Sequence, residues 1–322
     1  MKKIKAADDN PPFFSIVVPV YNEEKHIGSC LLSIFNSIYD GTQYEVIVVD
    51  NGSDDESLDI AKNSDARVFQ LTTGNVGAVR NYGAKQARGK VLVFIDADCL
   101  LDRNWLNRAE KLIQDQPYCA YGGGAWLPEH PTWTEELWLL NKKGMPALPK
   151  HLIGASTMIS KDLFLQLGGF NELISSGEDT DFHKKALYLK VPINISHELN
   201  VTHLGNAKNS IQFLMRQVWH SENYLHNLNS SAKDPIFLIT VAFALSFTTS
   251  AFSILTLSFN TNLTISLFTF AILPSILSCK RIYRARYFTW NPRKILGIYI
   301  LDLLYLIGRS IGLIKGLRII NR

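Results

Sequence analysis

Two aspartates, Asp96 and Asp98, close an apolar run in the stretch VFIDADCL. In an extended segment, side chains two residues apart point the same way, so we expect both carboxylates to face one site. Paired carboxylate oxygens suit Mg²⁺ or Mn²⁺, which typically bind through one or two carboxylates together with substrate phosphates. Because an isolated Asp-x-Asp is common, its meaning depends on the elements that position it.

Strand-like and helix-like segments alternate around this pair. Apolar, β-branched runs begin at Phe13, Tyr44, Ala66 and Lys90. Helix-like stretches lie between them at 24–38, 54–63 and 76–87. This alternation predicts an α/β fold with a mainly parallel, doubly wound sheet. The first strand ends in PVYNEE, without the Gly-rich turn that dinucleotide-binding enzymes and nucleotidyltransferases carry at this point.

Two other acids, Glu23 and Asp50, follow the first and second predicted strands. The carboxyl ends of parallel strands meet at one edge of the sheet, so we expect these acids to converge with Asp96 and Asp98. Taken alone, Asp50 is a turn or N-cap residue as often as a ligand, since Asn51-Gly52 makes a turn after it. Four converging acids are harder to explain by capping.

After Asp98 the alternation loosens. Residues 120–126 and 152–160 are predicted strands. Residues 208–228 are a predicted amphipathic helix that either packs on the domain or lies on a membrane surface. Three consecutive glycines, Gly122 to Gly124, fit a strand bulge or the close approach of a ligand equally well.

No Asp, Glu, Lys or Arg occurs from Pro235 to Cys279. A helical crossing needs roughly 20 apolar residues, so this length fits two crossings with a tip at 259–262. The alternative is a buried helical pair in a soluble core, but soluble helices rarely omit charges for so long. The segment is therefore predicted to be a transmembrane helical hairpin.

Six cations follow this hairpin, namely Lys280, Arg281, Arg284, Arg286, Arg293 and Lys294. The positive-inside rule places their loop, and with it the N-terminal domain, on the cytoplasmic side. The same cations could contact anionic lipid headgroups. Nucleic acid is not an expected partner, because the net charge of +4 is mild and the basic run adjoins a membrane segment.

The last apolar stretch, 295–307, contains Asp302. At a bilayer centre, the cost of this acid, about 2.5 to 3.5 kcal/mol, nearly offsets the gain from the surrounding Leu and Ile residues. Both flanks are basic, so we favour a helix lying in the interface over a third crossing.

The four cysteines and the N-terminal tail indicate the compartment. No Cys-x-x-Cys spacing occurs, which suits a reducing compartment and gives no cysteine metal site. The tail, residues 1–12, is basic but has no apolar core, so it is not expected to be a signal peptide.

Five ordered motifs give residues Phe13 to His203 a resemblance to family 2 glycosyltransferases of the GT-A fold. They are FSIVVPVYNEE, VIVVDNGSDDES, GNVGAVRNYGAKQARGKVLVFIDAD, GGF and GEDTDF. The resemblance implies a Rossmann-like GT-A domain, a nucleotide-diphosphate-sugar donor, Mg²⁺ or Mn²⁺, and transfer with inversion. The stretch QFLMRQVWH lacks the spacing of the Gln-x-x-Arg-Trp motif of processive synthases, which favours transfer of a single sugar.

The resemblance also implies roles for individual residues. The nucleoside would be held by Pro19, Tyr21, Glu23 and Asp50, with Arg80 nearby. Asp96 would face the ribose or diphosphate, and Asp98, the second acid of the DXD motif, would bind the metal. His203 is a candidate further metal ligand, although a lone histidine is more often structural.

The stretch SSGEDTDF places Glu178, Asp179 and Asp181 at a predicted helix start. Acids in a first turn favour the helix dipole and can simply cap the helix. The resemblance instead matches Glu178-Asp179 to the catalytic Glu-Asp motif of the family and implies that Asp179 is the base for the acceptor hydroxyl.

Together these features predict a membrane-anchored, inverting hexosyltransferase of cell-envelope glycans, multi-pass in the cytoplasmic membrane. Its expected partners are a nucleotide sugar, a lipid-linked or glycan acceptor, and the membrane. The predicted parts are a tail (1–12), a catalytic domain (13–207), a juxtamembrane helix (208–234), the hairpin (235–279), and a basic loop with an interfacial or third membrane helix (280–322). The alternative is a non-catalytic, membrane-bound nucleotide-sugar-binding scaffold.

Overall fold

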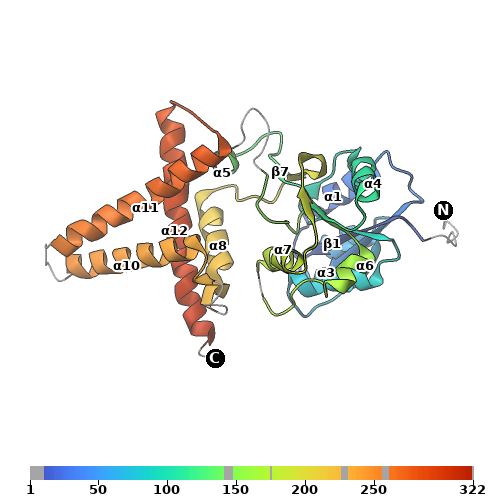
Figure 1. The fold of residues 1–322 in the computed structure, drawn as a ribbon, viewed down its shortest axis with the longest axis horizontal. Helices are drawn as coiled ribbons and strands as arrows, with labels where there is room; N and C mark the ends of the chain where they lie inside the picture. The colour runs from blue at the N-terminus through green and yellow to red at the C-terminus, as the bar shows by residue number, and fades with distance from the viewer. Residues whose placement is uncertain (1–10, 141–147, 175, 226–230, 256–260, 321–322) are drawn as a thin grey trace. The chain divides into compact units, whose positions relative to one another are not determined.

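The computed structural model describes residues 11–140, 148–174, 176–225, 231–255 and 261–320. The chain divides into two compact units (Figure 1). The N-terminal unit comprises Met1–Pro128 and Leu148–Gly205, and the C-terminal unit comprises Glu129–Ala147 and Asn206–Arg322. Residues 129–147, expected within the catalytic domain, thus belong to the C-terminal unit.

A seven-stranded sheet forms the centre of the N-terminal unit, in the order β3-β2-β1-β4-β8-β6-β9. Its strands are β1 (Phe14–Val20), β2 (Tyr44–Asp50), β3 (Arg67–Gln70), β4 (Val91–Phe94), β6 (Ala120–Gly122), β8 (Thr157–Ser160) and β9 (Ile193–Ile195). The pairs among β3, β2, β1 and β4 are parallel, as is β6 with β9, whereas β8 runs antiparallel to β4 and β6. The predicted mainly parallel α/β sheet is confirmed.

Helices cover both faces of this sheet. One face packs on α1 (Ile27–Phe35), α2 (Ser57–Lys62) and α4 (Trp105–Asp115). The other packs on α3 (Val76–Gln86), α6 (Lys161–Gln166) and α7 (Glu178–Tyr188). Within β1, Ile16 and Val18 belong to the first core and Val17 to the second. Both faces of β1 are therefore buried, which is why its sequence is continuously apolar instead of alternating.

A second sheet of three short strands, in the order β5-β10-β7, joins distant parts of this unit. It consists of β5 (Cys99–Leu100), β7 (Ala125–Trp126) and β10 (Val201–His203), with the 3₁₀ helix η1 (His197–Leu199) just before β10. A Cβ on Gly123 would lie 1.9 Å from the carbonyl oxygen of Leu199. The glycine run thus permits the close approach of another backbone segment.

The predicted strand at 152–160 is only partly correct. The strand β8 begins at Thr157. Before it, Ile153 and Ser156 form an isolated bridge closed by a hydrogen bond from Ser156 N to Ile153 O (3.1 Å). The apolar residues of this turn pack into the core, which made the segment look extended in sequence.

Glu45 on β2 accepts hydrogen bonds from Ser15 Oγ (2.7 Å), Arg88 N (2.6 Å) and Arg67 Nη1 (2.5 Å). Burial raises its pKa, but these donors outweigh burial and lower the pKa overall. Its stabilising effect is therefore present above the unfolded value near 4.5 and is lost as the pH falls through the lowered pKa. We expect Glu45→Gln to cost about 1.5 to 3 kcal/mol at pH 7. Urea denaturation should show that the difference in free energy of unfolding between the native chain and Glu45→Gln becomes smaller towards pH 3. A difference that does not change with pH would contradict a stabilising role for the ionised Glu45.

The C-terminal unit is helical. It contains α5 (Trp133–Leu139), α8 (Ser210–Ser221), the 3₁₀ helix η2 (Glu222–Leu225), α10 (Pro235–Leu255), α11 (Thr261–Ala285) and α12 (Pro292–Ile320). Figure 1 shows α10 and α11 side by side, reaching away from α12, and both helices contact α12. Two helices thus occupy the segment expected to form the hairpin, and half of the predicted tip, residues 259 and 260, lies outside the described residues.

Among the described residues, one helix is long and apolar enough to cross a membrane, Pro292–Gly316, and 33% of that apolar stretch is buried inside the protein. The apolar part of α10 is shorter, at Pro235–Ser250. This is a weak indication of membrane association. The two crossings expected within 235–279 stay a prediction.

Asp302 is paired with a cation inside the C-terminal unit. Its side chain is buried and accepts hydrogen bonds from Arg281 Nε (2.9 Å) and Ser278 Oγ (2.7 Å) on α11. Arg281 also donates to the carbonyl oxygen of Trp138 (2.7 Å), and its guanidinium lies 4.3 Å from the centre of that indole ring. The full penalty of an isolated acid in lipid therefore does not apply to α12.

Glycines every fourth residue on α12, at Gly308, Gly312 and Gly316, fit against the preceding helices. A Cβ on Gly312 would lie 2.2 Å from Val218 O of α8, and one on Gly316 would lie 2.5 Å from Glu222 O of η2. The structure shows α8 packed against α12 of its own unit, which is neither of the two positions expected from the sequence, and its contact with a membrane surface stays a prediction.

We expect Gly312→Leu to destabilise the C-terminal unit by about 1 to 3 kcal/mol or more, because the added side chain overpacks a backbone contact. Thermal unfolding and trypsin resistance of the detergent-solubilised chain measure this loss. Ile311→Leu, on the same helical turn but 39% exposed, is the matched control. If both variants had the melting temperature of the native chain, the contact between Gly312 and α8 would not be what holds α8 in place.

Candidate functional site

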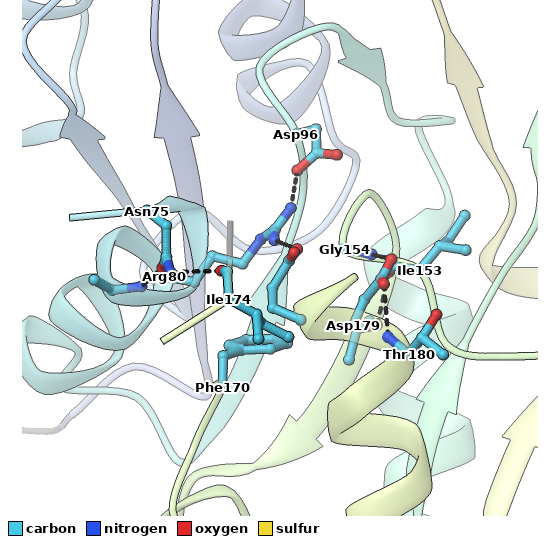
Figure 2. Close-up of polar contacts among 12 residues, drawn as sticks. Asn75, Arg80, Asp96, Ile153, Gly154, Phe170, Ile174, Asp179 and Thr180 are labelled. Atoms are coloured by element: carbon cyan, nitrogen blue, oxygen red, sulfur yellow. Dashed lines mark hydrogen bonds and ion pairs between the residues drawn. The ribbon is translucent and has the colours of Figure 1, made fainter. Parts of the chain in front are cut away.

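Arg80 is the centre of a polar cluster drawn in Figure 2. It lies on α3 and is 3% exposed. Its Nη2 lies 2.5 Å from Asp96 Oδ1, its Nη1 donates to Glu178 Oε1, and the ring of Phe170 lies 5.6 Å from its guanidinium carbon. Burial lowers the pKa of Arg80, but the charges of Asp96 and Glu178 outweigh this effect and keep the guanidinium charged.

Glu178 and Asp179 begin α7 but have different surroundings. Glu178 is 5% exposed, and burial raises its pKa despite the ion pair with Arg80. Asp179 is only partly buried, and both of its oxygens accept backbone hydrogen bonds, from Gly154 N (3.2 Å) and Thr180 N (2.6 Å) (Figure 2). Because Glu178 pairs with Arg80 of α3, it does more than cap its own helix. Asp179 is the more accessible of the two carboxylates.

Asp98 and His203 meet although more than a hundred residues separate them in sequence. The β5-β10 pairing places His203 opposite Cys99, and His203 Nε2 lies 3.6 Å from Asp98 Oδ2. With the Cys99 sulfur, their ligand atoms lie within 4.8 Å of one another. A Cβ on Gly205 would lie 1.8 Å from Asp98 Oδ2, so only glycine permits this arrangement. A carboxylate beside an imidazole fits a divalent cation such as Mn²⁺.

The two aspartates of the Asp-x-Asp motif do not share a direction, contrary to the expectation from extended geometry. The strand β4 ends at Phe94, and Cys99 N donates to Asp96 O (3.0 Å) across a turn. Because the chain turns here, the two-residue alternation of a strand no longer holds. Asp96 therefore contacts Arg80, while Asp98 lies beside His203.

The residues predicted to hold the nucleoside lie at the ends of β1 and β2. Pro19 is buried within β1, opposite Val49 of β2, and Tyr21 just beyond the strand is 57% exposed. Asp50 is fully buried, and its Oδ2 accepts hydrogen bonds from the backbone of the turn, including Gly52 N (3.0 Å). Glu23 N donates to Ser57 Oγ (2.7 Å). The structure shows the turn-forming role of Asp50, and its role as a ligand stays a prediction.

Two asparagines that the motifs did not single out hold the segment before Glu178. Asn75 caps α3 and donates through Nδ2 to Glu172 O (2.8 Å) and Ile174 O (2.5 Å) (Figure 2). Asn81 donates to Phe170 O (2.9 Å) and accepts from Phe170 N (2.9 Å). An Asn before a helix signals a cap, but nothing in the sequence indicates the partners, which lie 89 to 99 residues later.

Comparisons with known proteins agree with this architecture. The sequence profile described as "Glycosyl transferase family 2" matches residues 15–158. The chain is similar to the glycosyltransferase AglE of Haloferax volcanii, with 28% identity over 58% of this chain and 66% of that protein. It is also similar to TarS of Staphylococcus aureus, a poly(ribitol-phosphate) beta-N-acetylglucosaminyltransferase, with 30% identity over 54% of this chain and 32% of that protein.

These alignments span less than two thirds of each relative's own length. The mannosyltransferase PcManGT from Pyrobaculum calidifontis, solved with GDP-Man and Mn²⁺, has a similar fold. Its TM-score is 0.58 at 17% identity, with 95% of this chain and 88% of that chain covered. The profile match shows that residues 15–158 are similar to glycosyltransferase family 2, and the seven-stranded sheet and the fold of PcManGT agree with a GT-A-like α/β fold for the N-terminal unit.

Proposed function

We propose that the chain transfers one sugar from a nucleotide-diphosphate-sugar to an acceptor hydroxyl or phosphate, with inversion at the anomeric carbon. The observation that carries this proposal is the bridge of Arg80 between Asp96 and Glu178. It joins Asp96, just after β4, to Glu178 at the start of α7, which brings Asp96 and the Glu178-Asp179 turn together.

On the donor side, Pro19, Tyr21, Glu23 and Asp50 would hold the nucleoside. Asp96 would face the ribose or diphosphate. Arg80 acts here as a positioning residue, because both of its charged partners are protein carboxylates. Its role is to fix Asp96 and the Glu178-Asp179 turn relative to each other.

Asp98 and His203 would hold Mg²⁺ or Mn²⁺, since a carboxylate oxygen and an imidazole nitrogen converge there. When bound, such a cation neutralises the negative charge that develops on a departing nucleoside diphosphate. The protein's own contribution is to hold these donors in place through the pairing of β5 with β10.

On the acceptor side, Asp179 would take the proton of the acceptor hydroxyl as its oxygen attacks the anomeric carbon, opposite the departing diphosphate. A carboxylate base within hydrogen-bond reach contributes on the order of 10² to 10⁴ in rate. The backbone hydrogen bonds from Gly154 N and Thr180 N orient this carboxylate.

The C-terminal helices would anchor the enzyme as a multi-pass protein with its catalytic unit at the cytoplasmic membrane face, which favours a lipid-linked acceptor. Large apolar side chains on α10 and α11 are exposed, including Leu245 (61%), Phe252 (66%) and Phe268 (66%). Apolar exposure on this scale is unusual for a helix pair in water and fits contact with lipid.

Donor hydrolysis by the detergent-solubilised chain tests the proposal, with UDP-, GDP- and dTDP-sugars in Mn²⁺, Mg²⁺ or EDTA. We expect turnover of one donor, its loss in EDTA, and a raised metal requirement for Asp98→Asn and His203→Ala. Asp102→Asn, a largely exposed acid four residues from Asp98, is the control. If no donor is turned over and no nucleotide raises the melting temperature, the catalytic proposal is wrong and a non-catalytic scaffold becomes the better account.

A further inference from the structure

Three aromatic side chains near the end of α11 and just beyond it are among the most exposed in the protein. Tyr283 is 79% exposed, Phe288 is 78% exposed and Trp290 is 98% exposed. Aromatic rings contribute most when they are buried, and a Trp or Tyr left at a surface favours places where one side is apolar and the other wet. The three rings occupy eight consecutive residues, 283–290, which we name the aromatic loop.

This exposure is part of an ordered turn. Tyr287, in the middle of the aromatic loop, packs inward beside the core of Leu137, Phe213 and Ile298, and its N donates to Ile282 O (3.0 Å). At the other end, Arg293 N donates to the side chain of Asn291 (3.0 Å) as α12 begins. The aromatic loop is thus fixed from the inside, and its neighbouring rings face outward.

Five of the six cations in and around the aromatic loop, all except Arg284, fall into two groups. Arg281 and Lys294 pair with carboxylates of the same unit, Arg281 with the buried Asp302 and Lys294 with the partly exposed Glu136. Lys280, Arg286 and Arg293 form no ion pair with any carboxylate in the described part of the chain. No Asp or Glu occurs between Lys280 and Leu301, so the outward charge of the segment is positive.

Arg286 gives a second, independent observation. It follows Ala285, the last residue of α11, with φ of 50°, in the left-handed region where glycine is the usual residue. A long cationic side chain at this position costs backbone energy that glycine would avoid. An arginine at this position is accounted for if its guanidinium has a partner outside the protein.

The position of the aromatic loop between α11 and α12 defines the partner. If the α10 and α11 pair enters a bilayer, the aromatic loop follows its last apolar turn. If α12 enters instead, the aromatic loop precedes its first turn. In both cases residues 283–290 lie at the boundary between membrane and water, where aromatic rings and cations are enriched.

We propose that the aromatic loop, together with Lys280, Arg286 and Arg293, is a docking surface for anionic phospholipid headgroups. Phe288 and Trp290 insert at the level of the headgroups, and the three cations contact lipid phosphates. This inference rests on the membrane anchoring proposed above and adds a lipid preference to it.

Lipid nanodiscs containing the full chain test the docking. One set contains phosphatidylcholine alone, and the other contains phosphatidylcholine mixed with phosphatidylglycerol, an anionic lipid whose negative surface potential attracts Lys and Arg. The fluorescence of Trp290 is taken as the difference between the native chain and Trp290→Tyr. We expect the Trp290 emission to shift to the blue and to be quenched by brominated lipid, and both effects to be larger with phosphatidylglycerol. In the Arg286→Gln, Arg293→Gln double variant, the two lipids should give the same shift and the same quenching.

The controls separate docking from anchoring and catalysis. Tyr188→Ser removes an aromatic ring that is 85% exposed in the N-terminal unit and should leave the Trp290 signal unchanged. Resistance to carbonate extraction reports anchoring, and donor hydrolysis reports catalysis. An anchored chain whose Trp290 is not quenched overturns the docking proposal alone, as does equal quenching in both lipids. A native chain that carbonate removes overturns the anchoring and the docking together.

Two further variants distinguish a protein partner of the aromatic loop from a lipid partner. If Phe288→Ser and Trp290→Ser change the oligomeric state in detergent while lipid quenching of the native chain is absent, the surface binds another copy of the chain, and the lipid proposal is wrong.

Discussion

Asp179→Asn is expected to lower kcat by about 10² to 10⁴ while the affinity for the donor is retained. The amide keeps the shape of the carboxylate and can still accept the hydrogen bond from Gly154 N or Thr180 N, but it cannot take the acceptor proton. Single-turnover transfer and isothermal titration of the donor measure the two quantities separately.

Asp181→Asn is the matched control for this change. It lies in the same first turn of α7 and removes the same charge. If the helix dipole were the reason for the acids, the two variants would lose similar stability and similar activity. If Asp179→Asn transferred sugar at the native rate, the base would have to be another group, with Glu178 the nearest alternative.

Arg80→Leu is expected to lower the free energy of unfolding by about 3 to 5 kcal/mol and to abolish turnover. The change leaves Glu178, whose side chain is 7% exposed, without its cationic partner, and removing one member of a buried pair has costs of this size. Urea denaturation and donor hydrolysis measure the two losses.

A second substitution separates stability from chemistry. Adding Glu178→Gln to Arg80→Leu removes the uncompensated charge, so part of the stability should return without recovery of activity. Arg108→Leu breaks a partly exposed pair with Asp102 and a hydrogen bond to Glu198 O, and should cost about 1 kcal/mol. Stability of Arg80→Leu equal to that of Arg108→Leu would show that the bridge is not buried in solution.

Local sequence signals correctly predicted the elements that carry the site. The β-branched runs correspond to β1, β2, β3 and β4, and the predicted helix at 76–87 is α3, capped by Asn75. These signals work because strand and helix periodicity depend on neighbours within a few residues. They were weaker at 152–160, where an apolar turn resembles a strand.

The extent of α12 shows why a hydropathy sum over one stretch of sequence does not predict how that stretch is placed. The stretch expected at 295–307 is part of a helix that runs from Pro292 to Ile320. A hydropathy sum treats Asp302 as an isolated charge, whereas Arg281 and Ser278 of α11 satisfy it. The partner lies on another helix, so no window over α12 alone contains the information.

The sequence by itself determined the α/β order, the acids at the strand ends and the resemblance to family 2, because these features depend on residue type and short-range spacing. Only the tertiary structure decided what each acid contacts. The turn after β4 separates Asp96 from Asp98, Arg80 joins Asp96 to Glu178, and the pairing of β10 with β5 delivers His203 to Asp98. Such contacts join residues far apart in the chain, and their partners are fixed by packing and strand register, which residue type and local spacing do not specify.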